Sequence, residues 1–297
     1  MGPESQGAGA HEGQPAARSS GAEPSLRAHR DAGAGRVWAA GALERVGIVG
    51  FGAFGRLLAG VLSAHAPVLV CDARSVEAEQ ARRHGAVPAA LSDVCASGVV
   101  IFAVTAEGLR GALALASAHL AAGALVADVC SVKVGPVAWM TESVPVRCDV
   151  LGTHPLFGPQ TLAETGGVGG LTVALCPVRV GDQRLAAVEA FLGGALGLRV
   201  VRGTPEEHDR VMARVQAVTQ LVGQAALELG YTDHELATLG YRRLVQLGSN
   251  VAAQSEALFM TIQRHNPYAA QERARFRRAL GAIEGRIGGD AHAGGAG

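Results

Sequence analysis

The sequence predicts an α/β fold, a doubly wound parallel sheet, followed by an all-helical domain. Between residues 45 and 202 short apolar runs alternate with helical patterns, and after residue 204 only helical patterns remain. Apolar strands that alternate with helices are typical of a parallel sheet covered by helices on both faces. With 297 residues the chain is long enough to bury a core in each domain.

The two ends of the chain differ in composition from the rest. Residues 1–42 are mainly Gly, Ala, Ser, Pro and Glu without apolar periodicity, and residues 288–297 read the same way. Such segments bury too little apolar surface to offset the entropy of ordering, so we expect disordered tails. The sequence therefore divides into a tail at 1–42, a sheet domain at 43–203, a helical domain at 204–287 and a tail at 288–297.

Composition excludes several classes of partner. The 26 basic and 26 acidic residues cancel, which gives no electrostatic reason for nucleic acid or an anionic membrane to bind. No apolar run reaches the ~18–20 residues of a membrane span. The five cysteines are scattered without a C-x-x-C pair, as in a reduced protein without disulfides or a zinc site. We expect a cytoplasmic protein that binds a small-molecule substrate and no metal.

A glycine-rich turn follows the first predicted strand. The string G-F-G-A-F-G at 50–55 has the spacing G-x-G-x-x-G, and a helical pattern begins directly after it. In this setting two glycines let the backbone approach a pyrophosphate, and the third lets the helix pack on the strand. We therefore expect a Rossmann-type sheet that binds a dinucleotide. The residues expected to contact it are Gly50, Phe51, Gly52, Ala53, Phe54 and Gly55.

An acidic residue ends the second predicted strand, residues 68–72. In dinucleotide-binding sheets, an acid ~20 residues after the first glycine hydrogen-bonds the adenosine ribose hydroxyls. Asp72 has a similar spacing from Gly50, which favours NAD as the cofactor. Arg74 and Ser75 come directly afterwards and offer groups that could hold a 2′-phosphate, so NADP stays open as the cofactor. A turn or helix-capping aspartate is the alternative interpretation of Asp72.

Polar groups follow three further predicted strands. Thr105, Ser131 and His154 each come just after an apolar run, and Val104 ends the first of these runs. Because the carboxyl ends of parallel strands meet at one edge, we expect these residues to lie beside the glycine turn. Prolines and glycines hold His154 within residues 151–160, and a histidine exchanges protons near physiological pH, so His154 is the candidate acid or base. A loop histidine without a task is the alternative.

The remaining elements complete the alternation. Strands are expected at 98–104, 124–128, 170–175 and 198–202, and helices at 77–84, 105–119 and 182–192. Thr204 and Pro205 are typical of the N-cap and first turn of a helix, so they begin the helical domain. Helices are expected up to about residue 285, with breaks near Gly230 and at Asn266.

One long helix is predicted at residues 236–263. Leu244, Val251 and Leu258 recur every seven residues, and at 1.5 Å per residue this helix would be ~40 Å long. One small domain does not cover a helix of that length, so we expect a homodimer through the C-terminal helices. Burial in the core of a monomer is the alternative.

A polar stripe is predicted on the first helix of the helical domain. His208, Gln216 and Gln220 share one face of this helix, with Thr219 beside them. The hypothesis is that these side chains line a substrate pocket, and a solvated helix face is the alternative.

These motifs together resemble the prephenate and arogenate dehydrogenases of tyrosine biosynthesis. The resemblance covers about residues 45–285. It rests on G-F-G-A-F-G at 50–55, D-V-C-S-V-K at 128–133, G-T-H-P-L-F-G-P at 152–159, and E-H-D followed by Q-A-V-T within 207–219. The Leu-Phe-Met string before Asn266 is more similar to the arogenate-type members.

The resemblance implies an NAD(P)-dependent oxidative decarboxylation of a cyclohexadienyl substrate, prephenate or arogenate. His154 would deprotonate the C4 hydroxyl while the hydride leaves to the nicotinamide, so activity should rise as a group of pKa ~6–7 loses its proton. Ser131 would hydrogen-bond the same hydroxyl and orient the nicotinamide. Arg243, with Arg242 in reserve, would bind a substrate carboxylate through its guanidinium.

Several alternatives stay open at this point. Many family members have histidine where this chain has Gln220, so prephenate, arogenate and an amino-substituted prephenate all remain candidate substrates. A β-hydroxyacid dehydrogenase-like reductase would be expected to carry a lysine in its helical part, but no lysine follows Lys133. A non-catalytic NAD-binding protein would not need both Ser131 and His154.

Overall fold

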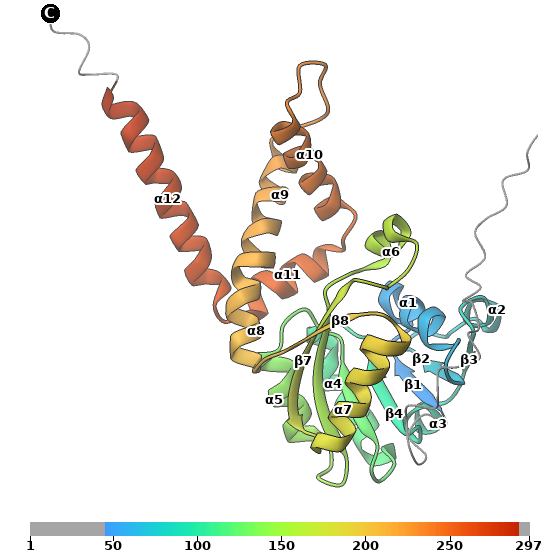
Figure 1. Cartoon of the computed structure of the whole chain (residues 1–297). Helices are drawn as coiled ribbons and strands as arrows, with labels where there is room; N and C mark the ends of the chain where they lie inside the picture. Colours follow the sequence, from blue (N-terminus) through green and yellow to red (C-terminus); the bar gives the residue numbers. More distant parts are fainter. Residues whose placement is uncertain (1–44, 291–297) are drawn as a thin grey trace, which may run out of the picture. The chain divides into compact units, whose positions relative to one another are not determined.

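The computed structural model describes residues 45–290 (Figure 1). These residues belong to one compact unit of the chain. The predicted tail at 1–42 lies outside the described residues, as does most of the tail predicted at 288–297. Residues 288–290 are the last residues of helix α12, so the helical part continues slightly further than expected.

An eight-stranded sheet forms the first part of the described chain. Its strands are β1 (Val46–Val49), β2 (Val68–Cys71), β3 (Ala86–Pro88), β4 (Val99–Phe102), β5 (Leu125–Asp128), β6 (Asp149–Pro155), β7 (Thr172–Arg179) and β8 (Arg199–Arg202). Their order in the sheet is β3-β2-β1-β4-β5-β6-β7-β8. The predicted doubly wound fold is therefore confirmed, and the strand order places β1 and β4 side by side at the centre.

One pair of strands departs from the predicted parallel sheet. β6 and β7 are antiparallel, whereas the other neighbouring strands are parallel. The segment between them holds the short helix α6 (Pro159–Thr165), and Leu156 N donates to Thr172 O, 2.8 Å away, where β6 ends and β7 begins. This connection returns the chain at the same edge instead of crossing a face. The prediction of an all-parallel sheet was wrong at this pair.

Helices cover both faces of the sheet. They are α1 (Ala53–Leu62), α2 (Ala78–Arg83), α3 (Leu91–Cys95), α4 (Ala106–Ala116), α5 (Val134–Ser143) and α7 (Asp182–Ala190). Successive strand residues belong to different cores: Leu151 packs in one with α1 and α7, and Val150 in the other with α3, α4 and α5. Figure 1 shows α7 and α4 on opposite sides of the sheet.

Four elements were not predicted, and three of them are short. β3 has 3 residues, α3 has 5 and α6 has 7, which is too few for a periodic pattern to develop. The fourth, α5, carries Gly135 and Pro136 in its first turn.

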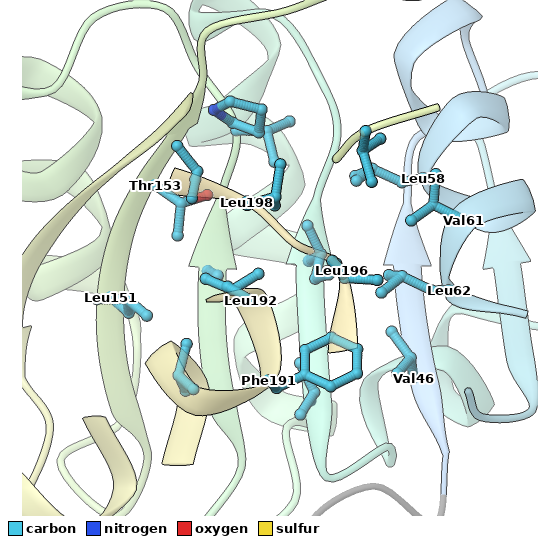
Figure 2. Close-up of a pocket in the computed structure, with 18 of the residues that line it drawn as sticks. Val46, Leu58, Val61, Leu62, Leu151, Thr153, Phe191, Leu192, Leu196 and Leu198 are labelled. Atoms are coloured by element: carbon cyan, nitrogen blue, oxygen red, sulfur yellow. The ribbon is translucent and has the colours of Figure 1, made fainter. Parts of the chain in front are cut away.

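An apolar cavity of about 120 Å³ lies on the face of the sheet covered by α1 and by the helical turn Phe191–Ala195 (Figure 2). Leu58, Leu62 and Phe191 approach it from the helical side, and Leu151 approaches it from β6. Almost every group that lines it is hydrocarbon, so this cavity offers no acid, base or charge for chemistry.

The second part of the described chain is helical, as predicted. Its elements are α8 (Pro205–Met212), a π-helical stretch (Ala213–Val218), α9 (Thr219–Glu228), α10 (Leu239–Ala252), α11 (Glu256–His265) and α12 (Ala269–Asp290). Thr204 Oγ1 accepts from Glu207 N at 3.1 Å, and the Glu207 carboxylate accepts from Thr204 N at 2.9 Å. This capping box confirms the predicted N-cap. The predicted boundary at 203–204 falls between β8 and α8.

The single long helix predicted at 236–263 was wrong. α10 ends at Ala252 and α11 begins at Glu256, where the Ser255 hydroxyl accepts from Leu258 N at 3.2 Å and caps the second helix. A residue that hydrogen-bonds the backbone at an N-cap competes with continuation of the preceding helix. The argument for a homodimer from helix length therefore fails.

The homodimer through the C-terminal helices stays a prediction. α12 has 22 residues, and its exposed apolar side chains Leu280, Ile283 and Ile287 recur at the spacing of one helix face.

No helix among the described residues is long and apolar enough to cross a bilayer. The cytoplasmic location likewise stays a prediction.

α9 and α10 pack against each other at two glycines. A Cβ atom on Gly223 would lie 2.7 Å from Val251 Cγ2 and 2.9 Å from Leu247 O, and one on Gly248 would lie 3.4 Å from Gly223 O. The two helices approach this closely because neither glycine carries a side chain.

Candidate active site

The glycine turn has the backbone geometry that its sequence predicts. Gly50 has φ of 104°, which favours glycine, and a Cβ on it would lie 2.4 Å from Ala103 O. A Cβ on Gly55 would lie 2.1 Å from Gly50 O, so α1 packs closely against the end of β1. Gly52 has open space around it and caps α1 without a side chain. The turn therefore leaves room and free N–H groups for a pyrophosphate at a helix N-terminus.

Asp72 lies at the end of β2 and contacts the glycine turn. Its Oδ2 accepts from Phe51 N at 2.7 Å, and its Oδ1 accepts from Arg74 N at 3.0 Å. Partial burial acts to raise the pKa of Asp72, but these backbone hydrogen bonds outweigh it and lower the pKa below its ordinary value. Asp72 also lines a hollow of about 220 Å³ together with Arg74 and Ser75. An ionised carboxylate beside an open hollow fits the ribose of a dinucleotide.

Two ring side chains connect the glycine turn with the loop after His154. The rings of Phe54 and Phe157 are 6.4 Å apart between centroids. The predicted meeting of the nucleotide turn and the histidine segment is therefore present in the structure. Ala53 and Phe54 lie in the first turn of α1.

His154 is part of β6 and does not follow it. The strand continues to Pro155, and His154 pairs with Ala174 of β7. The prediction that the strand stops before the histidine was wrong, because the antiparallel partner β7 extends the ladder. The backbone of His154 is consequently held by sheet hydrogen bonds.

His154 is 3% exposed, and its ring pairs with a second histidine. His154 Nδ1 lies 2.9 Å from His208 Nε2. His154 Nε2 makes no hydrogen bond with another described residue. Among the described residues, the fully buried side-chain atoms without a hydrogen-bond partner are the amide oxygens of Gln216 and Gln220. Nε2 is not one of them, so it is the ring nitrogen that reaches solvent.

His208 is in turn bound to Asp209, which connects α8 with the start of α5. His208 Nδ1 lies 2.8 Å from Asp209 Oδ1. The same carboxylate accepts from Lys133 N at 2.8 Å and from Val134 N at 2.9 Å. α5 has no side-chain cap of its own, so Asp209 satisfies two free N–H groups at its N-terminus.

A buried ion pair lies next to the histidines. Lys133 Nζ contacts the Asp128 carboxylate, and both side chains are fully buried. Lys133 Nζ also donates to Thr153 O at 2.5 Å, and Asp128 Oδ1 accepts from Thr153 N at 3.2 Å. These contacts tie the residue that precedes His154 to β5.

The surroundings keep His154 uncharged. Burial, the neighbouring His208 and the cation of Lys133 all lower the pKa of His154, which lies well below its ordinary value of 6.5. The ring therefore stays neutral as the pH falls through 6.5. A group of pKa ~6–7 was predicted from the sequence to control the activity. The structure corrects this prediction, because the pKa of His154 is lower.

Two other predicted contacts of the cofactor lie at the ends of strands, as expected. Thr105 caps α4, and its Oγ1 accepts from Gly108 N at 3.3 Å. Cys130 Sγ donates to Val104 O at 3.7 Å, so the segments that follow β4 and β5 are in contact. Ser131 is half-buried, and its hydroxyl makes no hydrogen bond with another described residue.

The polar stripe of the helical part divides into different environments. His208 and Gln220 are buried, Gln216 is half-buried and Thr219 is exposed. Gln220 Nε2 donates to Gln254 Oε1 at 2.7 Å, whereas its own amide oxygen has no partner. His208 contacts His154 directly, while Thr219 faces solvent.

The two predicted arginines lie on α10 and are exposed. Arg242 Nε lies 3.6 Å from Asp233 Oδ1, whereas Arg243 forms no ion pair with another described residue. Further along α10, Asn250 Oδ1 accepts from Gln160 Nε2 at 3.1 Å, which brings α10 to the segment that follows His154. Arg243 lies two helical turns from Asn250 on the same face of α10. Because Arg243 is exposed and forms no ion pair with another described residue, its guanidinium is available to a ligand.

No role was predicted for Asp209 from the sequence. Its carboxylate joins the two parts of the chain at the histidine pair, and the only local signal was its position directly after His208 in the E-H-D string.

Among the described residues no cluster of three or more His, Cys, Asp or Glu is arranged to hold a metal ion.

Known proteins are similar to this chain in sequence and in fold. A family model described as "Prephenate dehydrogenase, nucleotide-binding domain" matches residues 59–201, and one described as "TYRAAT1-like, C-terminal domain" matches residues 226–295. Arogenate dehydrogenase 1, chloroplastic, of Arabidopsis thaliana is 30% identical over 223 residues, which is 72% of this chain and 35% of that relative. Arogenate dehydrogenase 2, chloroplastic, of the same plant is 29% identical over 259 residues, 84% of this chain and 71% of the relative. The chain thus spans about a third of the first relative's length.

A solved structure shows the same fold. Prephenate dehydrogenase from Aquifex aeolicus, crystallised in complex with hydroxyphenyl propionate and NAD+, is 19% identical with a TM-score of 0.65, covering 85% of this chain and 93% of that chain. The sheet order and the glycine turn define a nucleotide-binding protein of the Rossmann type. The matches of the family model and of the curated relatives identify it further. The chain belongs to the prephenate/arogenate dehydrogenase family.

Proposed function

We propose that this protein catalyses the NAD-dependent oxidation of a cyclohexadienyl alcohol with loss of the ring carboxylate, a step of tyrosine biosynthesis. The observation that carries the proposal is His154, a buried neutral imidazole beside the glycine turn with one ring nitrogen engaged and the other open. A neutral imidazole is the form that accepts a proton from a hydroxyl.

Each residue has a defined task in this reaction. A bound nicotinamide supplies the hydride acceptor. His154 Nε2 takes the proton of the C4 hydroxyl, and the free hydroxyl of Ser131 hydrogen-bonds the same oxygen. Loss of the carboxylate as CO₂ makes the ring aromatic, so the protein mainly has to position the ring. The unpaired guanidinium of Arg243 binds a carboxylate of the substrate.

The buried amide oxygens favour arogenate over prephenate. Gln216 Oε1 and Gln220 Oε1 lie about one turn apart on the helix that carries His208, and both need a donor. The side chain of arogenate carries an ammonium group, with N–H donors, where that of prephenate has a keto oxygen. Two acceptors fit the ammonium group and repel the keto oxygen. Arogenate is therefore the proposed substrate.

The proposal is tested by offering the purified full chain NAD with arogenate or with prephenate and following NADH formation and the aromatic product. We expect kcat/KM for arogenate to exceed that for prephenate by at least about 10-fold, the effect of one hydrogen bond to a charged group. A preference for prephenate would overturn the substrate assignment. No NADH with either substrate, in a chain that binds NAD, would overturn the proposed reaction.

The proposed cofactor is NAD, with Asp72 as the residue that selects it. Replacing Asp72 with Ala is expected to raise the dissociation constant of NAD by about 10-fold or more, because a charge-assisted hydrogen bond to the ribose is lost. The dissociation constant of NADP should change little or fall, since Asp72 no longer repels the 2′-phosphate. Calorimetric titration of both nucleotides measures the two effects. An unchanged ratio of the two constants would show that Asp72 does not contact the ribose.

A further inference from the structure

We propose that His208 and Asp209 act through His154, and that together they determine which nitrogen of His154 is the base. The inference rests on the proposed function for its catalytic part. It changes the task expected of His208 from contact with the substrate to positioning of another side chain.

The direction of the hydrogen bonds follows from Asp209. Its side chain is fully buried and accepts from the backbone N–H groups of Lys133 and Val134, as an ionised carboxylate does. An ionised carboxylate is an acceptor only, so the His208 nitrogen 2.8 Å away, Nδ1, carries the proton.

The tautomer of the second histidine then follows from the first. In the uncharged form of His208, the proton on Nδ1 leaves a lone pair on Nε2, and this atom lies 2.9 Å from His154 Nδ1. His154 Nδ1 must therefore carry its proton and donate it. The lone pair of His154 is left on Nε2, the nitrogen that reaches solvent. One carboxylate thus sets the proton positions on two successive rings.

The same contacts support the proton transfer itself. When the O–H bond of the substrate breaks, the proton moves to His154 Nε2 and the ring becomes an imidazolium. Its Nδ1–H already donates to His208, and the negative Asp209 lies on the far side of that ring. Burial and Lys133 disfavour the cation, so this acceptor offsets part of their effect. No further proton has to leave His154 during the step.

Asp209 is a poor residue for testing the idea because it also caps α5. Replacing it would leave two N–H groups at that helix end without an acceptor. Variants of His208 separate the two tasks, since they leave the carboxylate on α5. Gln at 208 offers a carbonyl oxygen that accepts from His154 Nδ1, whereas Met has similar size without that acceptor.

The kinetic test compares His208→Met with His208→Gln. We expect His208→Met to lower kcat by about 100-fold with KM and the NAD dissociation constant within about threefold of the parent, and His208→Gln to recover at least about 10-fold of that loss. Equal kcat in all three proteins would overturn the proposal. So would a loss that appears mainly in KM, or one that His208→Gln does not relieve, because these outcomes indicate substrate contact or a structural role.

A second measurement reads the tautomer without relying on activity. NMR of the full chain with ¹⁵N-labelled histidine, assigned with the His154→Asn variant, should show His154 Nε2 at the shift of an unprotonated ring nitrogen and Nδ1 as protonated. The opposite tautomer would overturn the proposal even in an active protein. The expected tautomer in a protein that oxidises neither substrate would support the arrangement and contradict the proposed reaction.

Discussion

Replacing His154 with asparagine is expected to lower kcat by about 10²–10⁴-fold, the range of general acid–base catalysis. The asparagine amide can still donate to His208 Nε2 in place of His154 Nδ1, but it carries no counterpart of the basic Nε2. NAD affinity should change by less than about twofold, because His154 is not among the proposed contacts of NAD at the glycine turn and Asp72. The measurement is kcat under saturating substrate together with titration of NAD.

His119→Asn is the matched control, because His119 is exposed and follows the C-terminal end of α4, whereas Thr105 caps the N-terminal end of the same helix. It should have the parent's kcat. Comparable turnover in the His154 variant and the control would contradict the role of the imidazole.

The pH dependence follows from the same residue. Because burial, His208 and Lys133 lower the pKa of His154 well below 6.5, kcat/KM of the parent should not fall as the pH decreases through 6.5. The acid-side decline should appear only at lower pH, where the ring finally binds a proton. A decline centred at or above pH 6.5 would show that His154 is not the group that controls the rate.

Replacing Lys133 with methionine is expected to destabilise the fold by about 3–5 kcal/mol, the cost of leaving one partner of a buried ion pair without the other. Asp128 and Lys133 are both fully buried, so the remaining carboxylate would have no water to solvate it. The free energy of unfolding from a denaturant titration measures the loss.

Two comparisons make this prediction specific. The double variant Asp128→Asn with Lys133→Met should be less destabilised than Lys133→Met alone, because it removes the uncompensated charge. Arg83→Met breaks an exposed ion pair with Glu79 and should cost no more than about 1 kcal/mol. A cost for Lys133→Met as small as that for Arg83→Met would mean that Asp128 finds another partner or becomes protonated.

The parts of the fold that were predicted correctly depend on local patterns. Apolar runs bounded by glycine or a polar residue located seven of the eight strands, and the spacing of Gly50, Gly52 and Gly55 located the nucleotide turn. Thr204 with Glu207 located the start of the helical part. In each case the residues that determine the structure are close together in the sequence.

The parts that were missed depend on contacts between distant residues. His154 and His208 are 54 residues apart, and Lys133 and Asp209 are 76 apart, so no local pattern shows that they meet. The direction of β7 likewise depends on where the connection with α6 lies relative to the sheet. The break at Ser255 carried a local signal, a serine able to cap a helix, but the heptad spacing of apolar residues pointed to continuity.

The carboxylate of Asp209 has a consequence for biosynthesis of the protein. The sheet half is translated first, and in that half α5 begins without a cap and His154 has no acceptor for Nδ1–H. Both are supplied only when α8 docks. An incomplete chain could bind nucleotide at its glycine turn, yet its imidazole would have no defined protonation pattern. Catalytic competence would thus be acquired last, at the moment the helical half joins the sheet.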